Sequence, residues 1–227
     1  SRHSARLLIM ERPANRSFRL RGTRMTDGQA QAYEKYWDIY SLPENQKISP
    51  REVFPESKSV VMEIGTGMGE ATAEIAKTFP EIGFIGVELH KPGLGSLLNR
   101  IAEYELKNVR LICEDARVLL EENFPDDSLD GFHLYFPDPW PKVRHWKRRI
   151  VQKEFVELIH KKLKPGGYIH IATDWVAYAE WIKQRFEESG LFGGGEIEKP
   201  EYRPTTKFEG QGIRKGHRVT DLKYIKL

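Results

Sequence analysis

The sequence predicts an α/β protein with one doubly wound domain, in which helices cover both faces of a mostly parallel sheet. From about residue 58, short apolar runs alternate with longer stretches of helical periodicity, which is the pattern of such a sheet. The length of 227 residues suits one large domain or two small ones. With 39% hydrophobic and 30% charged residues, the composition is that of an ordinary globular chain and excludes wholesale disorder.

The first half of the predicted domain contains four strands, each an apolar run of strand length. They lie at residues 59–64, 82–89, 109–113 and 129–136. The segments between them are longer and periodic, which predicts helices over residues 70–78 and 92–106 and a short helical turn over 116–123. This alternation of strand and helix predicts that neighbouring strands run parallel.

The second half begins with a helix predicted over residues 149–163. The sequence KPGG at 164–167 ends it, because proline cannot continue a helix and glycine readily adopts the left-handed cap conformation. The glycine-rich segment 190–195 is predicted to be a flexible turn. The remaining elements are a strand at 168–173, a helix at 176–189 and a closing strand at 218–225.

Positive charge is concentrated in two segments, although the net charge is only +3. Residues 1–24 contain seven arginines and one glutamate, and residues 142–149 contain five lysines and arginines. Such basic segments suit a polyanionic partner, above all nucleic acid. The alternative interpretation of the N-terminal arm is a solvated or disordered tail.

The lengths of the apolar runs and the few cysteines and histidines exclude several classes of protein. No apolar run exceeds six residues, so we expect neither a membrane span nor a membrane partner. The single cysteine, Cys113, cannot form an internal disulfide, which fits a reducing, cytoplasmic location. Seven scattered histidines and one cysteine give no metal-ligand spacing, so we expect no metal.

A glycine-rich loop follows the first predicted strand. Gly65, Gly67 and Gly69 lie between that strand and a helix, where they let the backbone turn sharply and approach a ligand closely. Acidic residues stand at the ends of the first three strands, at Glu63, Glu88 and Asp115. A pyrophosphate would be repelled by them, whereas the ammonium and sulfonium of S-adenosyl-L-methionine would be attracted. The loop therefore favours S-adenosyl-L-methionine over NAD.

A proline-rich loop follows the fourth predicted strand, with the sequence FPDPWPK at 136–142. Ligands bind at the carboxyl ends of strands in a doubly wound sheet, so this loop should face the cofactor. Its prolines restrict the backbone that presents Asp138, and Trp140 offers a flat surface on which a purine could stack. The alternative is a rigid turn with a core tryptophan.

The run FPDPWPKVRHWKRR at 136–149 resembles the hallmark of the bacterial tRNA (guanine-N7-)-methyltransferases. The stretch RPTTKFE at 203–209, followed by Gly216-His217 and Asp221-Leu222, is similar to that family's second signature. Residues 21–26 and 33–37 also match its usual opening. The resemblance covers nearly all of the chain after about residue 17.

The resemblance implies a Rossmann-like methyltransferase domain over residues 31–227, with a seven-stranded sheet and an antiparallel C-terminal strand, after a basic extension over 1–30. It implies that Asp138 is catalytic and contacts the methyl donor together with Glu63, Glu88 and Asp115. It implies that the substrate guanosine is bound by Lys142, Asp174, Thr206, Lys207, Phe208 and Glu209. The residues implied to contact RNA are Arg144, His145, Lys147, Arg148 and Arg149.

The family transfers a methyl group from S-adenosyl-L-methionine to N7 of the guanosine at position 46 in the tRNA variable loop, and S-adenosyl-L-homocysteine is the product. Guanine N7 has a free lone pair, so no strong base is needed, and the carboxylate of Asp138 would stabilise the positive charge that develops. Asp174 could accept hydrogen bonds from guanine N1–H and the amino group; the alternative is that Asp174 caps the next helix.

Other functions remain open at this point. A methyltransferase acting on another RNA or on a small molecule would share the glycine loop, but a small-molecule enzyme has no use for the two basic segments. A non-catalytic RNA-binding protein would explain the basic segments but not the acidic strand ends. The sequence leaves open whether the chain is a monomer or a homodimer, and which tRNAs it prefers.

Overall fold

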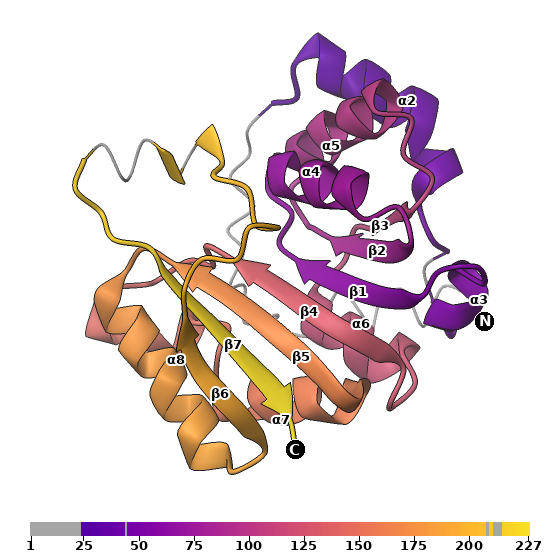
Figure 1. The fold of residues 1–227 in the computed structure, drawn as a ribbon. Coiled ribbons are helices and arrows are strands. Elements are labelled where there is room, and N and C mark those ends of the chain that lie inside the picture. Colours follow the sequence, from indigo (N-terminus) through magenta and orange to yellow (C-terminus); the bar gives the residue numbers. More distant parts are fainter. Residues whose placement is uncertain (1–23, 44, 208, 211–214) are drawn as a thin grey trace.

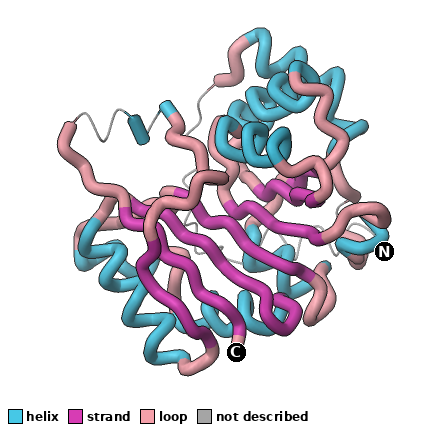
Figure 2. Tube along the Cα trace, viewed as in Figure 1, coloured by secondary structure: helices cyan, strands magenta, loops and turns pink. Residues whose placement is uncertain are grey.

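The computed structural model describes residues 24–43, 45–207, 209–210 and 215–227 (Figure 1). Most of the predicted basic extension, residues 1–23, and the predicted substrate-binding residue Phe208 lie outside the described residues. The described part of the chain forms a central sheet with helices on both of its faces (Figure 2).

The sheet has seven strands in the order β3-β2-β1-β4-β5-β7-β6. Strands β1 to β5 run parallel, and β7 is antiparallel to both of its neighbours, β5 and β6. The predicted fold class, a mostly parallel sheet with an antiparallel C-terminal strand, is therefore confirmed. The strands are β1 (Ser59–Ile64), β2 (Ile82–Val87), β3 (Val109–Ile112), β4 (Leu129–Tyr135), β5 (Leu163–Thr173), β6 (Phe192–Ile197) and β7 (Thr220–Lys226).

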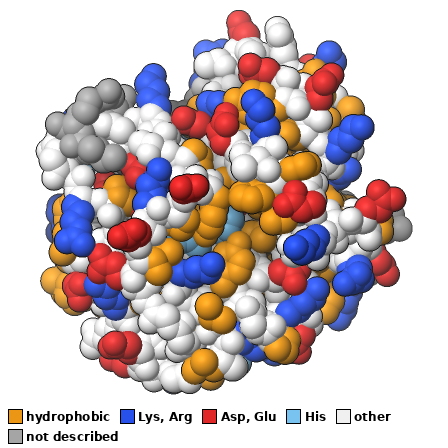
Figure 3. All heavy atoms as spheres, viewed as in Figure 1, with side chains coloured by type: hydrophobic (Ala, Val, Ile, Leu, Met, Phe, Trp, Pro, Cys, Tyr) orange, Lys and Arg blue, Asp and Glu red, His pale blue; other side chains and the backbone are white. Residues whose placement is uncertain are grey.

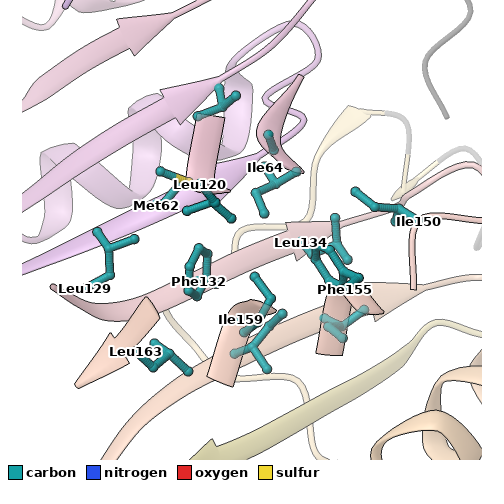
Figure 4. Close-up of a cluster of buried hydrophobic side chains, with 14 of the residues drawn as sticks. Met62, Ile64, Leu120, Leu129, Phe132, Leu134, Ile150, Phe155, Ile159 and Leu163 are labelled. Atoms are coloured by element: carbon teal, nitrogen blue, oxygen red, sulfur yellow. The ribbon is translucent and has the colours of Figure 1, made fainter. Parts of the chain in front are cut away.

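Two hydrophobic cores lie on the two faces of the sheet, because successive side chains of a strand point to opposite sides. In β1, Met62 and Ile64 belong to the core under α6, α7 and α8, while Val61 belongs to the core under α2, α4 and α5. Figure 4 shows the first core, where Phe155 and Ile159 of α7 approach Phe132 of β4. The helices are α2 (Asp27–Tyr40), α3 (Pro50–Val53), α4 (Glu70–Thr78), α5 (Lys91–Glu103), α6 (Ala116–Asn123), α7 (Lys153–Lys162) and α8 (Val176–Ser189), with the 3₁₀ helix η1 (Val143–Arg148).

The prediction of a flexible turn over residues 190–195 is wrong. Gly190 does turn the chain, with φ 64°, but residues 192–197 form β6 and pair with β7. Glycine is a poor strand former, so no local pattern could indicate this strand. The pairing also favours glycine at 194, where an added Cβ would lie 2.2 Å from the carbonyl oxygen of Lys223.

The helix predicted over residues 149–163 is α7, which begins later than predicted, at Lys153. Arg149, Ile150 and Val151 come before it and are buried. Its end agrees with the KPGG signal. The strand expected at 168–173 nevertheless begins earlier, at Leu163, and residues 164–167 form an irregularity within β5. Among the described residues, no helix is long and apolar enough to cross a bilayer.

Candidate active site

The predicted site residues gather where the parallel strands end at their carboxyl edge (Figure 1). Glu63 lies in β1, Glu88 follows β2, and Asp115 follows β3, while the FPDPWPK loop follows β4. These strands are neighbours in the order β3-β2-β1-β4. The sheet therefore brings together residues that are far apart in the sequence, such as Glu63 and Asp138, which are 75 positions apart.

The glycine loop needs its glycines because of its backbone. Gly65, Gly67 and Gly69 have φ values of 77°, 56° and 81°, a region that side chains with a Cβ rarely adopt. The loop also packs closely on α5, since a Cβ at Gly93 would lie 2.1 Å from the carbonyl oxygen of Gly67. The loop is thus an ordered turn at the start of α4.

Glu63 is buried beneath this loop, with 3% of its surface exposed. The hydroxyl of Thr72 donates a hydrogen bond to its carboxylate. Burial raises the pKa of Glu63 to about 7, against the lowering effect of the Thr72 hydrogen bond and with a further increase from Glu88. Glu63 is therefore a carboxyl group that a nearby cation would help to ionise.

Glu88 organises the backbone around the site. Its carboxylate accepts hydrogen bonds from the backbone N–H groups of Gly67, Leu89 and His90, at 2.8, 2.7 and 3.1 Å. The sequence predicted that Glu88 contacts the methyl donor. The structure adds a second task, because Glu88 ties the glycine loop to the end of β2.

Two buried oxygens in the site have no hydrogen-bond partner among the described residues, Asp115 Oδ2 and Thr66 Oγ1. The other oxygen of Asp115 caps α6 by accepting from the N–H groups of Arg117 and Val118. Asp115 Oδ2 lies 3.6 Å from the guanidinium of Arg117. Buried polar atoms are normally hydrogen-bonded, so these two oxygens fit a ligand that supplies donors.

The loop after β4 holds Asp138 in a restricted backbone. Phe136 and Trp140 have φ values of 52° and 43°, which cost about 1–3 kcal/mol for each residue that is not glycine. Asp138 is exposed between Pro137 and Pro139. Neighbouring contacts must therefore stabilise this conformation.

Arg149 supplies such contacts and does not lie on the surface with the other basic residues. It is 2% exposed, and its Nε donates a hydrogen bond of 2.8 Å to the carbonyl oxygen of Pro139. Burial lowers its pKa. The resemblance implied that Arg149 contacts RNA. The structure instead places its side chain inside the protein, beneath the Asp138 loop.

The other cations of this segment are accessible. Lys142, Arg144, Lys147 and Arg148 are exposed, and His145 is half-buried, with its ring edge-on to Trp140 at 5.7 Å. The guanidinium of Arg148 lies over the Trp140 ring at 5.0 Å, so the predicted stacking surface already carries a cation. On the face drawn in Figure 3, basic and acidic side chains are interspersed rather than segregated.

Asp174 follows β5 and does not cap α8. The N-cap position belongs to Trp175, which makes no side-chain cap hydrogen bond, so the capping alternative is wrong. The carboxylate of Asp174 lies 3.5 Å from Nδ1 of His217. Asp174 is only partly exposed, on the edge of the sheet that carries the other site residues.

The loop that contains Thr206 and Lys207 reaches the glycine loop from the far end of the chain. The backbone N–H of Lys207 donates to Oε2 of Glu70, the first residue of α4, at 3.1 Å. The Thr206 hydroxyl accepts from the N–H of Glu209 at 3.3 Å. Glu209 itself is buried, with 3% of its surface exposed, and both of its carboxylate oxygens bind Arg203.

Arg203 and its partners are functional candidates that the sequence analysis did not identify. Arg203 is 1% exposed and binds Glu209 and Asp221 simultaneously. Asp221 also pairs with His170 at 2.8 Å, and burial acts to raise the pKa of Asp221, but His170 and Arg203 lower it overall. The sequence placed Arg203 in a signature, but no sequence signal showed its burial.

A cleft of about 670 Å³ borders this network, lined among others by Arg203, Glu209, His217, Arg218 and Asp221.

Comparisons with known proteins show the family and the fold of this chain. A family model described as a putative methyltransferase matches residues 57–222. The chain is 44% identical over 214 residues to a tRNA (guanine-N(7)-)-methyltransferase of Nitrosomonas europaea, covering 92% of this chain and 96% of the relative. It is 46% identical over 215 residues to that of Nitrosospira multiformis, with coverage of 93% and 94%.

A solved structure of the 16S rRNA methyltransferase KamB resembles the fold, with a TM-score of 0.59 and 17% sequence identity. The match covers 82% of this chain and 98% of KamB. At this identity the likeness concerns the fold alone, which is Rossmann-like as predicted.

Proposed function

This chain belongs to the family of the tRNA (guanine-N(7)-)-methyltransferases, and from that membership we propose that it methylates N7 of a guanosine in tRNA. One observation of the structure carries the proposal. The hydrogen bond from Lys207 N–H to Glu70 brings the RPTTKFE segment to the helix that follows the glycine loop. A site for the methyl donor and a site for the methyl acceptor can therefore share one edge of the sheet. The enzyme would act in the cytoplasm.

The residues around the glycine loop fit S-adenosyl-L-methionine. Glu63 and Glu88 would supply negative charge, and Asp115 Oδ2 and Thr66 Oγ1 would accept hydrogen bonds that the described residues do not supply. Gly65, Gly67 and Gly69 leave backbone exposed to a ligand. S-adenosyl-L-methionine, when bound, supplies a methyl group on a sulfonium, a chemistry that requires no metal, and S-adenosyl-L-homocysteine is its product.

Asp138 would act by electrostatics and positioning. Attack by guanine N7 uses an available lone pair, so no base has to remove a proton. The imidazole ring of the base becomes positively charged, and a fixed carboxylate at that place stabilises the charge as it develops. The restricted backbone around Asp138 supports this role, because a preorganised group needs little rearrangement during the reaction.

The substrate guanosine would be bound from three segments. Asp174 would accept from guanine N1–H and its amino group, a pair of donors that adenine lacks. Lys142, Thr206, Lys207 and Phe208 would complete the pocket. Glu209 would contribute mainly by holding this segment, since Arg203 occupies its carboxylate.

The exposed cations Arg144, Lys147 and Arg148, together with half-buried His145, would hold the tRNA through its phosphates. The deep major groove of A-form RNA hides guanine N7. The target base, for which we propose guanosine 46 of the variable loop, would therefore have to leave its stack.

The test is methyl transfer from labelled S-adenosyl-L-methionine to an unmodified tRNA transcript. A matched transcript carries adenosine in place of the variable-loop guanosine. Incorporation into the first transcript alone, recovered as N7-methylguanosine, is the expected result. Equal incorporation into both would reject the target position, and no incorporation despite cofactor binding would indicate another acceptor.

A further inference from the structure

The basic run at 142–149 divides into two structural classes. Lys142, Arg144, Lys147 and Arg148 are exposed, whereas Arg149, the last residue of the run, is 2% exposed. A cation that contacts an RNA phosphate has to reach the surface. Arg149 therefore needs a different explanation from its neighbours.

One contact of Arg149 reaches the residue beside Asp138. Its Nε donates to the carbonyl oxygen of Pro139 at 2.8 Å. The backbone at this point is restricted on both sides, since Phe136 and Trp140 both have positive φ values. Pro139 lies between these two positions, so the hydrogen bond that it accepts from Arg149 can determine where the carboxylate of Asp138 lies.

The other contacts of Arg149 are with aromatic rings. Its guanidinium carbon lies 5.0 Å from the ring centre of Trp146, 5.1 Å from that of Tyr178 and 4.8 Å from that of Trp181. Trp146 belongs to η1, and Tyr178 and Trp181 belong to α8. Arg149 thus connects the loop to a helix of the scaffold.

Helix α8 is itself fastened to the segment after Arg149. The indole N–H of Trp181 donates to the carbonyl oxygen of Val151 at 2.7 Å, and the Tyr178 hydroxyl accepts from Val151 N–H at 3.3 Å. The rings of Tyr178 and Trp181 are therefore held in place independently of Arg149. They form a rigid support rather than a surface that adapts to the arginine.

We propose that Arg149 is a positioning residue, which fixes the loop that carries Asp138 and does not contact RNA. The proposal rests on the proposed function, because the role of Asp138 does. Arginine suits the task since its planar group can donate to a carbonyl in its plane while its faces contact aromatic rings. Lysine offers no planar group and cannot reproduce both contacts.

The experiment compares Arg149→Met with the matched variant Arg148→Met in tRNA binding at several salt concentrations and in single-turnover methylation at saturating tRNA. A lost phosphate contact lowers the slope of log affinity against log salt by about one. We expect that decrease for Arg148→Met only. We expect the saturated rate of Arg149→Met to fall by about tenfold to a hundredfold, with S-adenosyl-L-methionine affinity within about twofold of the unchanged protein.

Arg185→Gln is the structural control. The Arg185 guanidinium contacts Trp181, at 3.7 Å from the ring centre. Among the described residues it makes no hydrogen bond or ion pair with the loop that carries Asp138, so its replacement should leave the saturated rate unchanged. Hydrogen exchange provides a second measurement that does not depend on activity. Amides between residues 138 and 148 should exchange faster in Arg149→Met than in Arg185→Gln.

Three results would overturn the proposal. The first is a lower salt slope with an unchanged saturated rate in Arg149→Met. The second is an unchanged saturated rate together with unchanged amide exchange in that variant. The third is a loss of saturated rate in Arg185→Gln equal to that in Arg149→Met. If Arg149→Met does not fold, Arg149→Lys is measured in the same way, and a normal rate with normal exchange overturns the proposal. If the unchanged protein does not methylate tRNA, the proposed function fails, and the exchange result alone decides the role of Arg149.

Discussion

At the scale of single residues, Glu63 shows how burial changes the chemistry of an ordinary side chain. Its pKa is raised from 4.5 to about 7 because the carboxyl group is buried. In the folded protein this group therefore holds its proton over a pH range in which an exposed glutamate is ionised. A cationic ligand beside it would bind better to the ionised form.

We expect the affinity for S-adenosyl-L-methionine to rise with pH through about 7. From pH 6 to pH 8 the ionised fraction of a group with this pKa grows about tenfold, and affinity should follow it. Quenching of tryptophan fluorescence during titration measures the affinity. The variant Glu63→Gln should bind more weakly and lose this pH dependence; a variant that kept it would show that another group titrates.

Asp138 is the residue for which we propose the catalytic role. We expect Asp138→Asn to fold normally and to transfer methyl groups on the order of a hundredfold more slowly, because an amide does not stabilise developing positive charge. Single-turnover methylation measures the rate, and thermal unfolding checks the fold. Asp127→Asn removes a carboxylate from the turn before β4, at the opposite end of that strand, and should be active. Near-normal turnover in Asp138→Asn would refute the role given to its charge.

At the scale of elements, the glycine loop depends on the helix packed against it. An added Cβ at Gly93 of α5 would lie 2.1 Å from the carbonyl oxygen of Gly67, so either the loop or the helix must move. We expect Gly93→Ala to weaken S-adenosyl-L-methionine binding by about tenfold or more, measured by fluorescence titration. Gly28→Ala on α2 is the control, because nothing lies within 4 Å of its added Cβ, and equal weakening there would contradict the argument.

The segment 203–209 depends on the ion pairs of Arg203. Replacing Arg203 with methionine would leave Glu209 buried without its ion-pair partner and would leave Asp221 paired with His170 alone. We expect the free energy of unfolding to fall by about 3–5 kcal/mol, measured by urea denaturation. Arg218→Met breaks the exposed pair with Glu196 and should have a much smaller effect. Similar losses in both variants would mean that the Arg203 network adds little to stability.

At the scale of the whole molecule, three segments far apart in the sequence meet at one edge of the sheet. They are the glycine loop at 65–69, the loop and 3₁₀ helix at 136–149, and the segment at 203–209. The parallel strands bring the first two segments together. Strand β6 ends and strand β7 begins at the same edge of the sheet, so the segment 203–209 between them lies there as well. The proposed donor and acceptor sites are thus products of the topology rather than of any one segment.

The basic N-terminal arm belongs to this scale, because its charge acts over distance. Residues 1–23 contain six arginines and one glutamate. We expect a chain without them to bind tRNA more weakly and with a smaller salt dependence, while its affinity for S-adenosyl-L-methionine and its saturated methylation rate stay the same. Binding measured at several salt concentrations tests this, and an unchanged slope would favour the interpretation as a solvated tail.

The order of strands and helices was predictable from the sequence because hydrophobic periodicity is a local property. The boundaries of β1, α4, α6 and α8 agree with prediction to the residue. Strand β6 was not predictable, since its glycines form a strand only through pairing with β7. The glycine loop was also predictable, because left-handed backbone at Gly65, Gly67 and Gly69 requires that residue type.

The sequence by itself therefore determined the fold class, the glycine loop and the family resemblance. Only the tertiary structure decided which charged residues are available for binding. Arg148 and Arg149 are identical neighbours in sequence, yet one is exposed and the other is 2% exposed, and Glu209 is committed to Arg203 while Lys207 is exposed. Burial and pairing depend on partners that are distant in sequence, such as Trp181 for Arg149. Local sequence patterns do not indicate which distant residues will be those partners.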